Sequence, residues 1–294
     1  MTYSEIWHRI ATSYDDGEAR AIARILIEEL FGLSYADIVC GATDQLSADD
    51  TLRLDTAVRR IEQGEPLQHV LGYADFCGNR FCVNGSVLIP RPETEWLVDE
   101  GAKLMDGCVA SDETQHKAPH SPKRILDIGT GSGCIAISLK LRLGDAYVEA
   151  WDISEEALRT AQDNADALKA EVVFRKRDAL RADNTAAPWD LIVSNPPYIC
   201  DSERSAMDDN VLLHEPHTAL FVPDDDPLRF YRAIARYALL TLNTGGSLLF
   251  ECNTRYAEAT GKMLSDMGFE EVTVSDDCFN LPRFVRGRKN SHNQ

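Results

Sequence analysis

Apolar residues recur three or four positions apart through the first third of the chain, the spacing that gives a helix one apolar face. Two stretches share this pattern, with apolar positions at 19, 22, 23, 26 and 30 and at 54, 57, 58 and 61. Ser34 and Ser47 each precede an aspartate by three positions, an arrangement typical of a capped helix start. Gly64 and Pro66 then interrupt the pattern. We therefore predict a small helical bundle over residues 1–66, and we interpret its apolar stripes as core packing.

The segment 67–92 alternates short apolar runs with turn residues. Asn84 and Gly85 stand between the apolar runs 81–83 and 87–89, and Asn-Gly in that setting favours a two-residue hairpin turn. We expect this segment to form a β-hairpin linker, followed by a helix over residues 93–104. Residues 106–122 are polar and lack apolar periodicity, which predicts a surface loop whose His116 and His120 are solvated.

From residue 123 onward, apolar runs of strand length alternate with helical stretches. The expected strands span 123–128, 147–151, 171–174, 189–194, 246–251, 269–275 and 283–288, and the expected helices start at 134, 154, 227 and 256. This alternation predicts an α/β domain over residues 93–294, with a mostly parallel sheet covered by helices. Ligands of such a sheet bind beyond the carboxyl ends of its strands, so a site is expected at that edge.

Composition narrows the classes of protein that fit this fold. The chain has 294 residues, a hydrophobic content of 44% and a formal net charge of −18. That length and apolar content suit two domains with sizeable cores. The acidic charge argues against stable binding of bare nucleic acid, which needs clustered Lys and Arg. It suits an enzyme with a protein partner that carries basic patches.

The chain shows no sign of export or of metal binding. No apolar run approaches the length of a membrane span, and the first residues lack a signal peptide's basic-then-apolar pattern. The eight cysteines form no CxxC pair and no metal-ligand spacing. Cys77 and Cys82 could approach each other across a hairpin, but we favour reduced packing thiols. We therefore expect a cytoplasmic protein without a membrane segment or a metal site.

A glycine-rich turn follows the first strand of the predicted sheet. The run Gly129-Thr130-Gly131-Ser132-Gly133 leads into an apolar helix, and glycines there let the backbone pass close to a ligand. Its spacing differs from the dinucleotide fingerprint, and no Lys-Ser/Thr pair follows as in a phosphate-binding loop. The next strand ends at Asp152, where an acidic residue suits the hydroxyls of a ribose. Together these features predict an S-adenosylmethionine site.

A second motif, Asn195-Pro196-Pro197-Tyr198, follows the apolar run 189–194. Two consecutive prolines stiffen the loop and remove two backbone donors, so its polar atoms are mainly acceptors. The Asn195 oxygen and a backbone carbonyl could accept both N–H bonds of a planar amide or amino group. Tyr198 could wall this site or stack on a flat π system. The alternative is a proline-rich turn without chemistry.

These motifs resemble those of known methyltransferases. The DIGTGSG run at 127–133, together with NPPY at 195–198, is similar to the amino-group methyltransferases, which include adenine and guanine methyltransferases. With IPRPETE at 89–95, the chain resembles the release-factor glutamine methyltransferases (PrmC/HemK family) from about residue 20 to Arg288. The resemblance implies a Rossmann-like S-adenosylmethionine-dependent methyltransferase domain. It also implies that the preceding bundle recognises the protein substrate.

The resemblance assigns roles to the residues of both motifs. The residues implied to bind the cofactor are Gly129, Thr130, Gly131, Ser132 and Gly133 for its methionine part, Asp152 for the ribose, Asp178 and Ala179 near the adenine, and Asn195. The residues implied to hold the target glutamine are Asn195, Pro196, Pro197 and Tyr198, of which Asn195, Pro196 and Tyr198 are the catalytic group. Residues 91–94 would border the pocket, unless Arg91 and Glu93 form an ion pair that holds the linker. The segment 251–253 departs from the family's usual Glu-Ile-Gly, outside the expected chemical core.

The reaction implied by the resemblance is methyl transfer from S-adenosylmethionine to a glutamine amide nitrogen, N5. The glutamine would be that of the Gly-Gly-Gln motif of class I peptide-chain release factors, which would modulate translation termination and leave S-adenosylhomocysteine. Three alternatives are an adenine or guanine methyltransferase acting on nucleic acid, a methyltransferase for another protein's glutamine, and a cofactor-binding protein without catalysis. We expect a monomer whose partner is the release factor.

Overall fold

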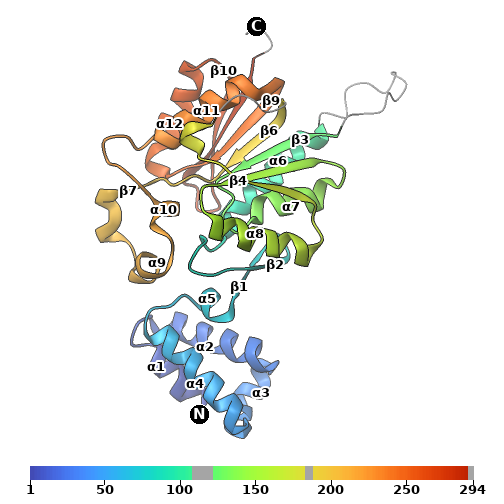
Figure 1. Cartoon of the computed structure of the whole chain (residues 1–294). Helices are drawn as coiled ribbons and strands as arrows, with labels where there is room; N and C mark the ends of the chain where they lie inside the picture. Colours follow the sequence, from blue (N-terminus) through green and yellow to red (C-terminus); the bar gives the residue numbers. More distant parts are fainter. Residues whose placement is uncertain (108–121, 183–187, 291–294) are drawn as a thin grey trace. The chain divides into compact units, whose positions relative to one another are not determined.

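The computed structural model describes residues 1–107, 122–182 and 188–290. The chain divides into two compact units, both drawn in Figure 1. The helical unit comprises residues 1–73, 83–85 and 207–215, and the sheet unit comprises the remainder. Segments 83–85 and 207–215 belong to the helical unit, although they are separated from its other residues in the sequence. The predicted domain boundaries at residues 66 and 92 did not assign these segments to the bundle.

The helical unit is a small bundle with one apolar core. Its elements are α1 (Tyr3–Ile10), α2 (Asp16–Phe31), α3 (Tyr35–Val39), the 3-10 turn η1 (Ala42–Gln45), α4 (Ala48–Glu62), α5 (Leu67–Leu71) and α9 (Asp209–His214). The predicted helix starts are confirmed, because the hydroxyls of Ser34 and Ser47 accept hydrogen bonds from the backbone N–H three residues on. Both predicted apolar stripes pack into the core, with Leu30 half-buried and the other stripe residues buried.

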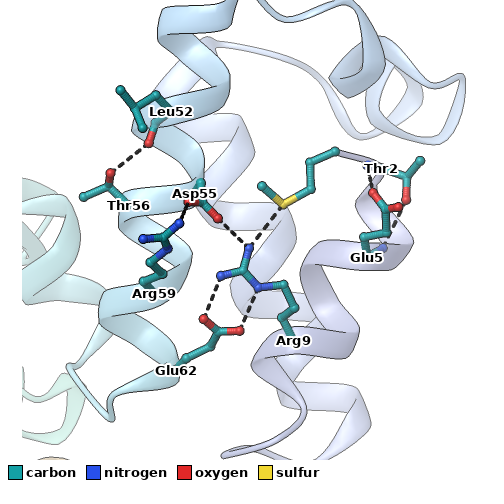
Figure 2. A network of polar contacts seen from close by, with 9 residues as sticks. Thr2, Glu5, Arg9, Leu52, Asp55, Thr56, Arg59 and Glu62 are labelled. Atoms are coloured by element: carbon teal, nitrogen blue, oxygen red, sulfur yellow. Dashed lines mark hydrogen bonds and ion pairs between the residues drawn. The ribbon is translucent and has the colours of Figure 1, made fainter.

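A polar network joins the first and fourth helices of this unit (Figure 2). The Arg9 guanidinium donates to both carboxylate oxygens of Glu62 at 2.7 Å and to Asp55 Oδ1 at 2.8 Å. Arg59 pairs with the other oxygen of Asp55 at 2.5 Å. The Arg9 hydrogen bonds hold the pKa values of Glu62 and Asp55 below their usual range. This bidentate geometry ties α1 to α4 at a defined register.

The sheet unit is built on a seven-stranded sheet in the order β10-β11-β9-β6-β3-β4-β5. Its strands are β3 (Arg124–Ile128), β4 (Tyr147–Asp152), β5 (Val172–Lys176), β6 (Trp189–Ser194), β9 (Leu242–Glu251), β10 (Phe269–Asp276) and β11 (Pro282–Lys289). The strands from β9 to β5 run parallel, and β11 is antiparallel to both of its neighbours. The predicted α/β class and mostly parallel sheet are therefore confirmed.

Helices cover both faces of this sheet, with α6, α7 and α8 on one side and α11 and α12 on the other (Figure 1). They are α6 (Glu95–Gly107), α7 (Cys134–Leu143), α8 (Glu155–Leu168), α11 (Arg229–Thr241) and α12 (Ala257–Asp266), with the short α10 (His217–Leu220) near the sheet edge. Successive strand positions alternate between the two cores, so Ile125 packs on the α6 side and Leu126 on the α11 side. Burial on both faces explains why these strands are continuously apolar.

Short elements complete the sheet unit. They are β1 (Tyr73–Phe76), β2 (Asn79–Cys82), β7 (Ile199–Cys200), β8 (Phe221–Val222), and the 3-10 turns η2 (Pro92–Thr94), η3 (Ala179–Arg181), η4 (Asp201–Ala206) and η5 (Thr254–Tyr256). The expected helix over 93–104 is α6, which begins two residues later, after η2.

The predicted hairpin exists, but its expected position was wrong. Strands β1 and β2 are joined at Cys77 and Gly78, whereas Asn84 and Gly85 lie beyond β2 and no strand spans 87–89. Both turn residues have positive φ, 47° and 73°, as a tight type I′ hairpin requires. The Glu95 carboxylate accepts from the Cys77 backbone N–H at 2.7 Å, and Asn79 donates to the Cys77 carbonyl at 3.0 Å. These contacts hold a cysteine in a conformation that non-glycine residues rarely adopt.

The expected surface loop at 106–122, with His116 and His120, lies almost wholly outside the described residues. Across the three described ranges, no helix is long and apolar enough to cross a membrane. Each of the seven cysteines in those ranges, Cys77 and Cys82 included, is a free thiol.

Candidate active site

The glycine turn connects β3 to α7 at the carboxyl edge of the sheet. Gly129, Gly131 and Gly133 have φ values of 77°, 54° and 82°, which L-residues with side chains rarely adopt. The N–H groups of Gly129 and Thr130 both donate to the Trp151 carbonyl, at 2.8 and 2.9 Å. A side chain at Gly133 would lie 2.9 Å from Ile137 Cδ1, so the third glycine lets the turn pack closely on α7. The sequence therefore fixes this turn by conformation and by space.

The buried carboxyl group of Asp127 holds the glycine turn through a hydrogen bond with Thr130. Asp127 on β3 is 0% exposed, and its carboxylate accepts a hydrogen bond of 2.6 Å from the Thr130 hydroxyl. Burial raises the Asp127 pKa to about 7. The hydroxyl fixes where Thr130 lies, and with it the path of the turn.

Asp152 ends β4 beside the turn. One carboxylate oxygen accepts from the Gly131 N–H and the other from the Ser154 N–H, both at 2.9 Å. Burial raises the pKa of Asp152, and the backbone donors oppose that rise. These bonds orient the carboxylate while leaving lone pairs that can accept from ribose hydroxyls.

The NPPY loop leaves β6 next to the glycine turn. The Ser194 hydroxyl donates to the Ile128 carbonyl at 2.6 Å, which ties the end of β6 to the end of β3. A Cβ placed on Gly129 would lie only 3.9 Å from the Asn195 carbonyl oxygen, so the two loops run side by side. The Tyr198 N–H donates to the Leu220 carbonyl at 3.2 Å, which anchors the far end of the loop.

One cavity of about 370 Å³ opens between these loops, within the size range of small-molecule sites. Its lining includes ten of the predicted site residues: Gly129, Thr130, Gly131, Ser132, Asp152, Asp178, Ala179, Asn195, Pro196 and Pro197. Arg91 and Thr94 also line it, as expected for the 91–94 segment. The glycine backbone, an acceptor carboxylate and a largely apolar wall suit the polar, ribose and aromatic parts of S-adenosylmethionine.

Two predicted residues, Gly133 and Tyr198, are not part of the cavity lining. Gly133 is the N-cap of α7 and faces Ala161 beneath the turn. The Tyr198 hydroxyl lies inside the fold, 3.3 Å from Glu251 Oε1, and burial raises its pKa. The expectation that Tyr198 walls the site is therefore not what this geometry shows, because its hydroxyl is turned toward a buried carboxyl.

The end of the cavity near Ala179, where the adenine is predicted, contains residues that the sequence pattern did not single out. Phe230 and Ile234 on α11 and Leu180 on η3 line it beside Ala179. Apolar side chains from these two elements supply the contact area that the small Ala179 alone does not. These residues lie far from the glycine turn in the sequence, so no local pattern could assign them to the site.

Comparison with known proteins agrees with this geometry. The family described as "Methyltransferase small domain" matches residues 96–220, and "PrmC N-terminal domain" matches residues 8–72. A release factor glutamine methyltransferase of Bacteroides thetaiotaomicron is 43% identical over 277 residues, covering 94% of this chain and 95% of the relative. One of Flavobacterium psychrophilum is 36% identical, covering 94% of each chain. The chain belongs to the release factor glutamine methyltransferase family.

Membership of the release factor glutamine methyltransferase family confirms several predictions made from the sequence. These are the family itself, an S-adenosylmethionine-dependent enzyme, methyl transfer, and a Rossmann-like domain preceded by helices. The solved hMettl16 catalytic domain shares the fold, with a TM-score of 0.52, 17% identity and 84% of each chain covered.

Proposed function

We propose that this chain transfers a methyl group from S-adenosylmethionine to N5 of a glutamine side chain, the glutamine of the Gly-Gly-Gln motif of class I release factors. The observation that carries the proposal is one cavity shared by the glycine turn and the NPPY loop. The glycine turn is suited to the cofactor, and the NPPY loop presents hydrogen-bond acceptors to an amide nitrogen.

The cofactor half of the site has a role for each loop. The glycine turn would hold the methionine part along its exposed backbone, and Asp152 would accept from the ribose hydroxyls. Asp178 is held by the Leu180 N–H at 2.9 Å, so the adjacent backbone has a fixed course where the adenine would lie. The cofactor supplies a methyl carbon on a positively charged sulfur, and the sulfur keeps the bonding electrons when the carbon moves to nitrogen.

The acceptor half of the site solves a problem of reactivity. A glutamine amide nitrogen is a weak nucleophile because its lone pair is delocalised into the carbonyl. The Asn195 oxygen and the Pro196 carbonyl would accept its two N–H bonds and orient the lone pair. The same acceptors stabilise the positive charge that develops on nitrogen. One N–H proton then leaves to water, which completes N5-methylglutamine and S-adenosylhomocysteine.

Release factors are favoured over nucleic acid as the substrate. Relatives named for release factors match this chain over 94% of its length, and the family model of their N-terminal domain matches residues 8–72 of the helical unit. A net charge of −18 disfavours a phosphate backbone as partner. We further propose that the enzyme acts as a monomer in the cytoplasm. Size-exclusion chromatography with light scattering tests the first statement, and fractionation of cells tests the second.

The decisive assay uses labelled S-adenosylmethionine with a purified class I release factor. Parallel reactions contain a release factor whose Gly-Gly-Gln glutamine is alanine, and total RNA or DNA. Label on the intact factor alone supports the proposal, whereas label on nucleic acid overturns the substrate assignment. In the enzyme, Asn195→Ala should lower kcat by about a hundredfold or more, the scale for losing a group that stabilises developing charge. The dissociation constant for S-adenosylmethionine should stay within about twofold, measured by calorimetry, and a parallel loss of cofactor affinity would contradict the acceptor role.

A further inference from the structure

A buried pair of side chains lies directly behind Asn195. Thr94 ends η2, just before α6, and Glu251 ends β9; they are 3% and 0% exposed. The Thr94 hydroxyl lies 2.7 Å from Glu251 Oε2, although 157 positions separate the two residues. The Asn195 Nδ2 atom lies 3.5 Å from the same Thr94 oxygen. The three side chains therefore form a hydrogen-bonded series that ends at Asn195, the proposed acceptor.

The number of hydrogens available for the Glu251–Thr94–Asn195 contacts decides which way the Asn195 amide faces. A threonine hydroxyl has one hydrogen, and a carboxylate can only accept, so the short contact uses that hydrogen. Thr94 can then only accept from Asn195, which places the amide NH2 group toward Thr94. The Asn195 oxygen consequently faces the other way, free to accept from a substrate N–H.

Glu251 is itself held in place. The Tyr198 hydroxyl donates to its second oxygen at 3.3 Å, and the Tyr231 hydroxyl donates to its backbone carbonyl at 3.3 Å. This explains the inward direction of the Tyr198 ring: the last residue of the NPPY motif supports the carboxylate that orients the first.

We propose that Thr94 and Glu251 are positioning residues for methyl transfer, which fix the Asn195 amide with its oxygen toward the glutamine nitrogen. The inference rests on the proposed acceptor role of Asn195. It gives a function to the threonine of the IPRPETE segment and to a glutamate outside both motifs. Neither residue needs to touch the substrate, because each acts through Asn195.

The test compares Thr94→Val, which keeps the shape but loses the hydroxyl, with Thr94→Ser, which keeps the hydroxyl. For the full-length enzyme, we expect Thr94→Val to lower kcat about tenfold to a hundredfold, because misorientation of a reacting group has costs of that order. Cofactor affinity should stay within about twofold. Thr94→Ser should retain at least about a third of the wild-type kcat. Thr241→Val is the matched control, because its buried hydroxyl donates within its own helix α11, at 2.9 Å to the Tyr237 carbonyl.

Each outcome decides between the hypotheses. Wild-type kcat in Thr94→Val, with Asn195→Ala inactive, overturns the positioning role and leaves the proposed acceptor intact. An active Asn195→Ala overturns the acceptor role and this inference with it. Equal losses in Thr94→Val and Thr94→Ser would show that packing, not the hydroxyl, matters. Where Thr94→Val fails to fold by circular dichroism, the pair Thr94→Ser and Thr94→Ala isolates the hydroxyl instead, with the same expectation for the alanine variant.

Discussion

At the scale of single residues, the protonation of Glu251 links the site to pH. Burial raises its pKa to about 7, and Glu93 adds to this effect while Arg283 and the Thr94 and Tyr198 hydrogen bonds oppose it. The ionised carboxylate accepts from Thr94, whereas the protonated group can donate to it. Donation would release the Thr94 hydrogen toward Asn195 and disturb the amide orientation.

We therefore expect kcat to rise with pH and to level off above an inflection near pH 7. The form needed for activity is the deprotonated one, so activity is lost as the pH falls through the raised pKa. Initial rates at saturating cofactor and release factor, between pH 5.5 and 9, measure the profile. Glu251→Gln cannot ionise, and its profile should lack this inflection. An inflection that persists in Glu251→Gln would assign the titration to another group.

From the sequence alone, candidate site residues could be located only where consecutive residues form a motif. The glycine turn and NPPY each carry their own signal, and the parallel sheet brings both to one edge, as their positions after strands indicated. The orientation of Asn195 could not be predicted, because it depends on Thr94 and Glu251, which are far apart in sequence. The departures from the family pattern in segment 251–253 were expected to lie outside the chemical core, yet the Glu251 side chain contacts Thr94, which lies next to Asn195.

At the scale of elements, the close packing of the glycine turn on α7 makes Gly133 sensitive to substitution. Gly133→Ala combines a φ of 82° with an approach of 3.0 Å to Ala161 Cβ and 2.9 Å to Ile137 Cδ1. We expect a loss of about 2 to 4 kcal/mol in the free energy of unfolding, the sum of backbone strain and overpacking. Cofactor affinity should fall with it, since the turn is displaced.

Gly32→Ala provides the matched control for that substitution. Gly32 has a φ of 66° at the end of α2, and nothing lies within 4 Å of the added Cβ. Only the backbone strain remains, about 1 kcal/mol. Urea unfolding followed by circular dichroism measures both variants. Equal losses would show that space at Gly133 is not limiting.

The Arg9 network predicts how the helical unit responds to acid (Figure 2). Glu62 and Asp55 have lowered pKa values in the folded chain because Arg9 donates to them. Their stabilisation is therefore complete above about pH 4.5 and is lost as the pH falls through the lowered values. Arg9→Met should destabilise the helical unit by roughly 1 kcal/mol at pH 7 and by much less near pH 3.

Arg53→Met is the control, because Arg53 pairs with Asp50 on the exposed side of α4, with 59% of its side chain accessible. Thermal unfolding at both pH values should show little effect of this change. A loss in Arg9→Met that is as large at pH 3 as at pH 7 would mean that packing of the arginine stem, and not its ion pairs, stabilises α1.

Elements with strong periodicity were predictable, and tight turns were not. The strand at 189–194 and the capped starts of α3 and α4 follow from local sequence alone. The hairpin was misplaced because Asn84-Gly85 has the favoured turn composition, while the actual turn uses Cys77 in a positive-φ conformation. That conformation depends on Glu95, eighteen positions away, which no local pattern reveals.

At the scale of the whole molecule, the division into two units predicts where cofactor binding is felt. Every residue that lines the cavity belongs to the sheet unit. A ligand that binds only the folded sheet unit stabilises it by about 2.7 kcal/mol at a hundred times its dissociation constant. Because the helical unit has its own core and its own polar network, we expect cofactor binding to leave its stability unchanged.

Hydrogen exchange followed by mass spectrometry tests this distribution. With S-adenosylmethionine at about a hundred times its dissociation constant, backbone amides at 129–132, 153–154 and 177–180 should exchange at least about tenfold more slowly. Amides of α1, α2 and α4 should exchange at unchanged rates. The variant Asp152→Asn serves as the control, since weaker ribose binding should reduce the protection at a fixed cofactor concentration. Slower exchange throughout α1, α2 and α4 would show instead that both units unfold cooperatively. The cofactor would then stabilise the helical unit as well as the sheet unit.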